Sequence, residues 1–434
     1  APEMLRTPLD ELILQICLLY EQRRDDFYKT NTNEGSASFA SGAQPIKFLS
    51  MTPAPPPRSS LLQACRHLLE VDALRVVGTD EGEEDTWSYR LTPLGYHLSR
   101  LPMDAKVGKV LIVGCILGCL DGALTVAAAL SCTKSCFLSF RMQETALQAR
   151  ESLIENGFGG KDWPGGTVKG DLIAVIAAYR AWVKHKSDGQ KWKFCSYHAM
   201  DNTTLRDIDR LRNQFRDLLV DAGFVSTRKQ HGNGNDDCNQ ASEDALLTSC
   251  CLVAGLYPNI CSLIRPRKGG PRGGRLLTND GDECRPQSNS FQRKRLQHAA
   301  ENGKDAYAVY HGKHRSIGTV SSSQGGGQRS RPPEVFLTEV NFVSRFALLF
   351  FGGNLEIVKN AIIVDGWLKF KVSSSDNEKG SGGVDNIALI LALREKLDDM
   401  ILVHVAESKD NSELLLEQHQ SVIHLVRKLL SEEG

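Results

Sequence analysis

The residues best suited to bind a charged partner form a basic stretch in the second half of the chain. Between Ile264 and Leu276 five cationic side chains alternate with glycine and proline: Arg265, Arg267, Lys268, Arg272 and Arg275. Glycine and proline keep such a backbone flexible and exposed, so the stretch is able to follow phosphate groups and release their counterions. A solvated loop that charge keeps soluble has the same composition. These residues alone leave both interpretations open.

The charge of the chain is unevenly distributed, although its formal net charge is zero. From Tyr257 to Arg331 there are 14 Lys and Arg against 5 Asp and Glu, and from Asp376 to the C-terminus there are 6 against 12. This asymmetry predicts one face that attracts phosphates and another segment that stays solvated or contacts a protein. Further cations of the basic region are Arg293, Lys294, Arg295, Lys313 and Arg315.

Motifs for catalysis are missing from the sequence. It contains no G-x-x-x-x-G-K-[ST] phosphate loop, because Gly159-Gly160-Lys161 lacks the spacing and is followed by Asp162. It also contains no DExH box, G-x-S-x-G or HExxH motif. We therefore predict no catalytic residue and no cofactor on this chain, and the residues alone leave open whether the protein is an enzyme.

The twelve cysteines have neither the spacing of a disulfide framework nor that of a zinc site. They indicate buried thiols in a reducing intracellular compartment, with the cytoplasm favoured and the nucleus or an organelle left open. The most apolar stretch, Val110 to Leu130, contains Asp121 at its middle and several glycines. A charge at that depth is unfavourable in a bilayer, so the stretch predicts two buried helices joined at residues 120–122 and no membrane segment.

Hydrophobic periodicity predicts a multidomain α+β chain. Residues 1–102 show a helix–helix–hairpin pattern typical of a winged helix, with a polar, mobile insertion at 22–50. Residues 103–226 carry almost only helical patterns, and 227–240 form a polar linker. Residues 241–434 combine short strands, typical of an OB-fold barrel, with two C-terminal helices. The strands are predicted at 307–310, 335–340, 347–351, 361–364 and 367–372.

Short segments spread along the chain provide a second kind of evidence. In order they are PEMLRTPLDELILQI, LLQACRHLLEVDAL, LTPLGYHLSRLPMDAKVGKVLIVGCILGCLDGALTVAAALS, GDLIAVIAAYRAW, FCSYHAMDNTTLRDIDRLRNQF, LVAGLYPNI, VFLTEVNFVSRFALLFFGG and VDGWLKF. In this order they resemble the winged-helix, ratchet-like and OB-fold domains that end DEAH/RHA-box RNA helicases. The resemblance implies a module that holds single-stranded RNA against two RecA-like motor domains. The motor, with its ATP and Mg²⁺, is absent from this chain.

The resemblance also implies RNA contacts at matching positions. They are Thr204, Arg212 and Gln214 in a TL…LR.Q motif, Arg285 and Ser288 in a His-Pro-x-Ser motif, and Lys313 in a YHxK motif. Arginine stands where the family has histidine at 285; a phosphate contact survives this change, because arginine is a strong bidentate donor. A helix-surface ion pair with Asp207, Asp209 or Asp217 is the alternative role of Arg212.

Two other functions fit the sequence. One is a non-catalytic scaffold derived from such a helicase, which docks on a ribonucleoprotein or protein partner through its acidic C-terminal helices. The other is a winged-helix DNA regulator whose recognition helix is residues 59–71; that helix offers only Arg66 and His67 to a phosphate-lined groove.

Overall fold

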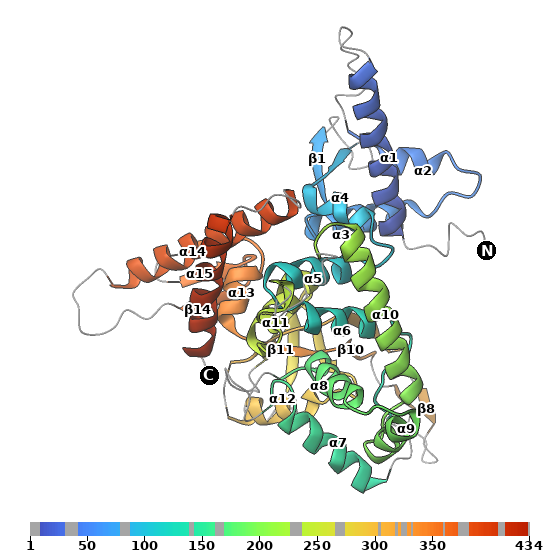
Figure 1. Cartoon of the computed structure of the whole chain (residues 1–434), viewed down its shortest axis with the longest axis vertical. Coiled ribbons are helices and arrows are strands. Elements are labelled where there is room, and N and C mark those ends of the chain that lie inside the picture. Colours follow the sequence, from blue (N-terminus) through green and yellow to red (C-terminus); the bar gives the residue numbers. More distant parts are fainter. Residues whose placement is uncertain are drawn as a thin grey trace.

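The computed structural model of the 434-residue chain combines helices with four sheets (Figure 1). It describes residues 9–30, 42–78, 87–138, 143–160, 169–225, 237–264, 274–302, 305–316, 320–322, 328–330, 333–358, 361–371, 382–406 and 413–432.

The N-terminal part packs helices against a hairpin. Its elements are α1 (Leu9–Thr30), α2 (Pro45–Ser50), α3 (Arg58–Glu70), β1 (Leu74–Gly78), β2 (Ser88–Leu91) and α4 (Pro93–Ser99). The strands pair antiparallel, with Leu74 opposite Leu91. Thr92 caps α4 by accepting a hydrogen bond from the Gly95 amide. The predicted helices correspond to α1 and α3 and the predicted hairpin to β1 and β2, whereas α2 between the two helices was not predicted.

The predicted insertion at 22–50 is wrong at both of its ends. Helix α1 continues to Thr30 and α2 occupies Pro45–Ser50, whereas residues 31–41 lie outside the described part. Glu21 and Arg24 form an i,i+3 ion pair at 2.9 Å in the extension of α1. Charged residues with good helix propensity prolong a helix without adding an apolar stripe, so hydrophobic periodicity misses them.

Among the described residues, seven helices make up the middle of the chain. They are α5 (Ala105–Ile116), α6 (Leu120–Ser131), α7 (Glu144–Asn156), α8 (Asp171–Val183), α9 (Asp188–Tyr197), α10 (Asn202–Asp221) and α11 (Ala245–Leu256), with a 3₁₀ turn at Asp237–Asn239. Aspartates cap three of them, Asp104 on α5, Asp201 on α10 and Asp244 on α11. The predicted pair of buried helices is confirmed as α5 and α6, although they join at 117–119. No helix in the described residues combines the length and apolar character needed to cross a membrane.

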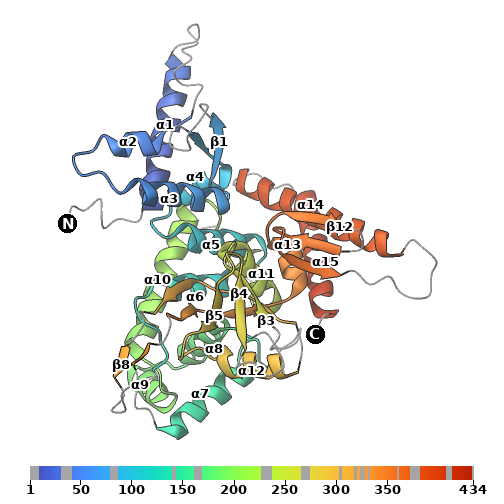
Figure 2. The ribbon, with the colours of Figure 1, turned by 180° about the vertical axis from the view of Figure 1, so that it is seen from behind.

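A seven-stranded mixed sheet follows, in the order β11-β6-β3-β4-β5-β10-β7. Its strands are β3 (Ile260–Ile264), β4 (Arg275–Thr278), β5 (Glu283–Pro286), β6 (Tyr307–Val309), β7 (Gly312–Arg315), β10 (Val335–Thr338) and β11 (Asn341–Val343). Only the β5–β10 pair is parallel. Helix α12 (Gln292–Glu301) packs on this sheet, and β8 (Val320–Ser322) pairs with β9 (Gln328–Ser330). Figure 2 shows the strands β3, β4 and β5 on one side of the helices.

The C-terminal part contains a small sheet and three helices. They are β12 (Leu355–Val358), β13 (Ala361–Val364), β14 (Leu368–Lys371), α13 (Arg345–Phe351), α14 (Gly382–Ala406) and α15 (Glu413–Glu432). The predicted hairpin at Asp365-Gly366 is confirmed, and both turn residues have positive φ. The predicted strand at 347–351 is wrong: Ser344 caps α13 by accepting from the amides of Phe346 and Ala347. A short, uniformly apolar run has no periodicity that separates a buried strand from a buried helix.

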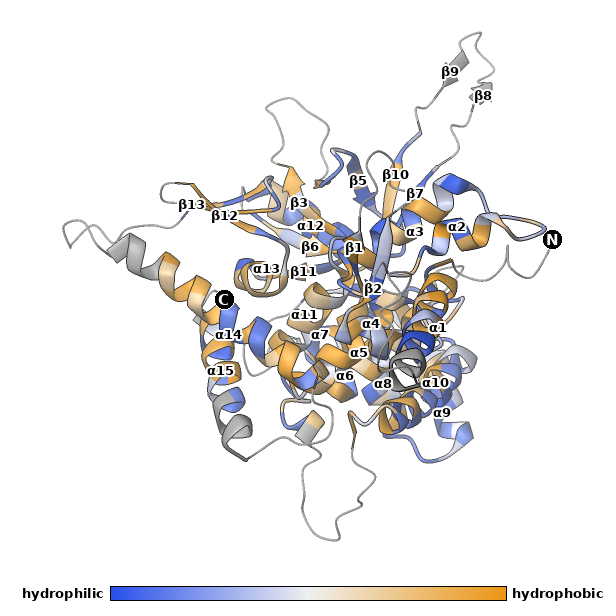
Figure 3. Cartoon of the chain, turned by 90° about the horizontal axis from the view of Figure 1, so that it is seen from above, coloured by the Kyte–Doolittle hydropathy of each residue, from blue (hydrophilic) through white to orange (hydrophobic). Residues whose placement is uncertain are grey.

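One hydrophobic cluster extends from Ile13 to Leu430, and a smaller one lies within the seven-stranded sheet around Cys261 and Leu337. Figure 3 shows the apolar residues concentrated on α5, α6 and α11. Helices α5 and α11 approach closely at Gly255, where an added Cβ would lie 2.2 Å from the Val110 Cγ2 atom. Glycine at this position therefore permits the close packing of α5 against α11 in the core.

Candidate nucleic-acid interface

Helix α10 carries three of the predicted RNA-contact residues, in different environments. The Thr204 side chain is buried, and its hydroxyl donates to the Asp201 carboxylate at 2.7 Å. Burial would raise the pKa of Asp201, but hydrogen bonds from Thr204 and the first amides of the helix lower it. Gln214 is exposed on the same helix. Thr204 therefore stabilises the N-terminal cap of α10. The Gln214 side chain, in contrast, is accessible to a ligand.

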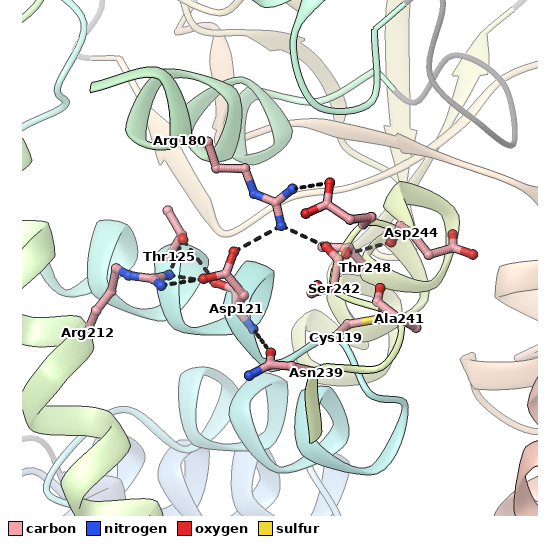
Figure 4. Close-up of polar contacts among 11 residues, drawn as sticks. Cys119, Asp121, Thr125, Arg180, Arg212, Asn239, Ala241, Ser242, Asp244 and Thr248 are labelled. Carbon is pink, nitrogen blue, oxygen red and sulfur yellow. Dashed lines mark hydrogen bonds and ion pairs between the residues drawn. The ribbon is translucent and has the colours of Figure 1, made fainter. Parts of the chain in front are cut away.

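Arg212 points into the fold (Figure 4). Its side chain is 12% exposed and forms an ion pair with Asp121. The guanidinium group also donates to the backbone oxygen of Asp121 at 2.6 Å and to the Thr125 hydroxyl, and it lies 4.5 Å from the Tyr179 ring centroid. The ion-pair partner thus comes from α6 and is none of the nearby aspartates of α10. Arg212 would have to leave this network to reach a phosphate.

Arg180 of α8 approaches the same carboxylate from the other side (Figure 4). It pairs with Asp121 at 2.9 Å and with Glu243 at 2.9 Å, and it donates to the Ser242 oxygen at 2.7 Å. Burial would raise the pKa of Asp121, but the two guanidinium groups outweigh burial and lower it. This carboxylate therefore stays ionised and joins α6, α8 and α10.

The cations on strand β7 already have acidic partners. Lys313 lies within ion-pair distance of Asp280 and at 2.6 Å from Asp282, and Arg315 lies 3.6 Å from Asp282. Burial would lower the pKa of Lys313, but the hydrogen bonds with the two carboxylates raise it. The local charge is therefore much lower than a count of lysines and arginines suggests.

Strands β4 and β5 repeat this arrangement. Arg275 pairs with Glu283 at 2.6 Å, and Arg285 lies 3.6 Å from Glu334. Ser288, just after β5, is exposed. The other cations of the predicted basic loop lie outside the described residues: Arg265, Arg267, Lys268 and Arg272.

The junction between α8 and the sheet contains a buried carboxylate that sequence reasoning missed. Asp171, the first residue of α8, accepts hydrogen bonds from the Ser290 hydroxyl at 2.7 Å and from the amides of Phe291 and Val340 at 3.0 Å. The Asn341 side chain in turn accepts from the Leu172 amide at 2.9 Å. Burial raises the pKa of Asp171 to about 6 despite these donors. An acidic residue at a helix start gave no signal that it would join the sheet.

Comparison of the sequence with known proteins relates the chain to helicases. Residues 104–175 match the model of the helicase associated domain (HA2), ratchet-like. The chain is related to the C-terminal region of DEAH/RHA-box RNA helicases. It is 28% identical over 379 residues to the ATP-dependent DNA/RNA helicase DHX36 of Bos taurus, covering 85% of this chain and 31% of that protein. The resemblance found in the short segments is thereby confirmed.

Plant relatives extend this helicase relationship. The DExH-box ATP-dependent RNA helicase DExH1 of Arabidopsis thaliana is 28% identical over 429 residues, covering 98% of this chain and 35% of that protein. DExH3 from the same plant is 30% identical over 267 residues, covering 62% of this chain and 18% of that protein. The chain spans about a third or less of the length of these relatives.

Proposed function

We propose that this chain is the RNA-binding C-terminal module of an ATP-dependent DEAH/RHA-type RNA helicase. It holds single-stranded RNA against RecA-like domains of the same protein, and those domains carry ATP and Mg²⁺. The observation that carries the proposal is the helicase relationship, which extends over 98% of the chain in one relative. The match to the ratchet-like domain over residues 104–175 supports the same role for α5, α6, α7 and the start of α8.

We assign the domains on the same basis. Residues 1–102 form a winged-helix domain, 103–226 a ratchet-like domain, and 241–434 an OB-fold domain with two C-terminal helices, after the linker 227–240. The hairpin that follows α3 supports the first assignment. The mixed seven-stranded sheet with its own apolar cluster supports the third.

The proposed RNA contacts divide by accessibility. Gln214 and Ser288 are exposed and need no rearrangement to reach RNA. Arg275, Arg285, Lys313 and Arg315 contact phosphate by exchanging a carboxylate partner for a phosphate. Arg212 and Thr204 hold the helix that presents Gln214, and Arg265, Arg267, Lys268 and Arg272 are further cations that precede β4 in the sequence.

RNA titration at several salt concentrations tests this function. The 434-residue chain is expected to bind a fluorescein-labelled oligouridylate at low salt, with an affinity that falls steeply as salt rises. Replacing Arg265, Arg267, Lys268 and Arg272 by glutamine should reduce the slope of log affinity against log salt by about 0.7 for each lost phosphate contact. Absence of binding at low salt would refute the proposal.

A non-catalytic scaffold is the second candidate, and one observation favours it. The C-terminal helices expose large apolar side chains, with Leu389 63%, Leu402 56% and Leu425 51% exposed. Apolar residues on an outer face mark protein contacts when they are grouped. A chain that binds no RNA but forms a stable complex with a ribonucleoprotein would support the scaffold.

A further inference from the structure

We propose that the outer face of α9, together with the adjoining end of α8, is a stacking site for the bases of single-stranded RNA. This site is separate from the positions that the helicase motifs indicate. The inference rests on the proposed function, because it assumes that single-stranded RNA is the ligand of the chain. It adds the residues that bind bases, whereas the motif residues offer mainly amide, hydroxyl and cationic groups.

Two aromatic rings are exposed on this face. Trp192 is 63% and Tyr197 is 68% exposed. Lys193 and Ser196 are exposed between them, while Cys195 on the opposite side of α9 is buried in the core. Rings that are open to solvent on a folded helix offer their faces to nucleobases, which stack on aromatic side chains without sequence preference.

The surface around these rings is hollowed on both sides. A cavity of about 310 Å³ lies between Trp192 and the start of α7, at Gln143 and Ala146. A larger cavity of about 750 Å³ lies between α7 and α8, and its lining includes Val183 and Lys184. Tyr197 lines both cavities. A strand of bases therefore has room on each side of this tyrosine.

The charge of this face complements phosphate. Residues 183–198 contain four lysines and one acidic residue. Lys184, Lys186 and Lys193 are exposed, and they have no ion-pair partner in the part of the chain that the structure describes. The acidic residue, Asp188, pairs with Arg206 at 2.9 Å. These lysines differ from Lys313, which two carboxylates already neutralise.

The remaining charged groups of the face change this balance little. Glu144 at the start of α7 is the acidic residue next to the smaller cavity. Lys191 lies over the Trp182 ring, 3.8 Å from its centroid, so its charge stays near the base of α9. Asp121 and Glu243 also line the larger cavity, but both pair with Arg180. Three lysines without an ion-pair partner among the described residues, against Glu144, leave a cationic surface that attracts phosphates with counterion release.

The α9 face is held rigidly. A rigid surface binds stacked bases better than a mobile one, because less conformational entropy is lost on binding. Ser187 and Gln190 form a reciprocal capping box at the start of α9. At the other end, Asn202 accepts from the Trp182 indole at 2.9 Å and begins α10. Helices α7 and α9 lie together at the end of the molecule opposite α1, in both Figure 1 and Figure 2. The site therefore adjoins the N-terminal end of α10, where Thr204 is found.

Binding of single-stranded RNA by variants of the full 434-residue chain tests the site. We expect Trp192→Ala and Tyr197→Ala each to weaken binding of a fluorescein-labelled 20-residue oligouridylate about tenfold, the size of one lost stacking contact. Trp192→Phe should retain most of the affinity. The matched control is Phe48→Ala on α2, which removes a ring that is 60% exposed and remote from the site. It should leave the affinity unchanged.

The lysines are tested by their salt dependence. The triple variant Lys184→Gln, Lys186→Gln, Lys193→Gln should lower the slope of log affinity against log salt by about 2, at about 0.7 per lost phosphate contact. A blunt RNA duplex should not distinguish Trp192→Ala from the wild type, because its bases are already stacked.

Each outcome decides between the two proposals. If the wild type binds RNA but the two alanine variants and the lysine variant bind equally well, the stacking site is refuted and the proposed function stands. If Phe48→Ala weakens binding as much as Trp192→Ala, the effect is not specific and the site is also refuted. If the wild type binds no RNA, both proposals fall.

Discussion

The ion network around Asp121 provides a sharp test of how the helices are held together. The perturbation is Asp121→Asn, which keeps the shape of the side chain and removes its charge. Arg212 and Arg180, whose side chains are 12% and 17% exposed, then lose their shared anionic partner. Breaking a fully buried ion pair costs about 3–5 kcal/mol, and an exposed pair contributes about 0.2–1 kcal/mol.

The magnitude lies between these limits. The Asp121 side chain is 33% exposed, so solvent screens part of its charge. We therefore expect a loss of about 2 kcal/mol of local stability, equivalent to about 30-fold faster hydrogen exchange in α6 and α10. Hydrogen–deuterium exchange with mass spectrometry measures this locally, which suits a chain with more than one core.

The matched control is Asp207→Asn. Asp207 pairs with Arg210 on α10, with side chains 41% and 78% exposed. Loss of this surface pair should change stability by less than about 0.5 kcal/mol. Equal effects of Asp121→Asn and Asp207→Asn would refute our reasoning that the network joins three helices.

The pH dependence of the same network has a definite sign. The pKa of Asp121 is lowered in the folded chain, so its contribution is present above the unfolded pKa of about 3.9. The contribution is lost as pH falls through the folded pKa. The difference in the free energy of unfolding between the wild type and Asp121→Asn should therefore be constant from about pH 5 to about pH 8.

Two further predictions concern stability. The pKa of Asp171 is raised to about 6 in the folded chain. The contribution of this carboxyl group to the free energy of unfolding should therefore decline as pH rises from about 4 to about 6. The melting temperature of the Asp171→Asn variant, measured against pH, should lack this decline. Gly255→Ala should lower the melting temperature, at a cost of about 1–3 kcal/mol, because its Cβ would meet Val110. Gly189→Ala, at an open position in the first turn of α9, should raise stability by about 0.5 kcal/mol. Melting temperatures of both glycine variants that shift in the same direction would contradict the packing argument.

Local signals made much of the secondary structure predictable. The Asp365-Gly366 turn identified its hairpin because type I′ turns require positive φ at both positions. The amphipathic stripe of α10 identified that helix in the same way. The helix α13 was missed, because after Arg345 its sequence FALLFF is apolar without interruption and shows neither the helical nor the strand period.

The partners of the candidate site residues were less predictable, because they are remote in sequence. Arg212 has aspartates within five residues on its own helix, yet it pairs with Asp121, 91 positions away. Lys313 similarly pairs with Asp280, which lies in the turn between β4 and β5, 33 positions away. A net charge summed along the chain cannot show which cations are neutralised by the fold, whereas the exposed Trp192 and Tyr197 become distinctive only once their burial is known.

Helix α8 fixes the distance between the seven-stranded sheet and the outer face of α9. Its first residue is fastened to the seven-stranded sheet through Asp171, and its last residue, Val183, lines the larger cavity beside α9. Twelve helical steps separate them by about 18 Å. A helix with ten buried residues resists bending, so α8 keeps the sheet and the α9 face at a fixed distance from one another. A ligand that spans both must match that length.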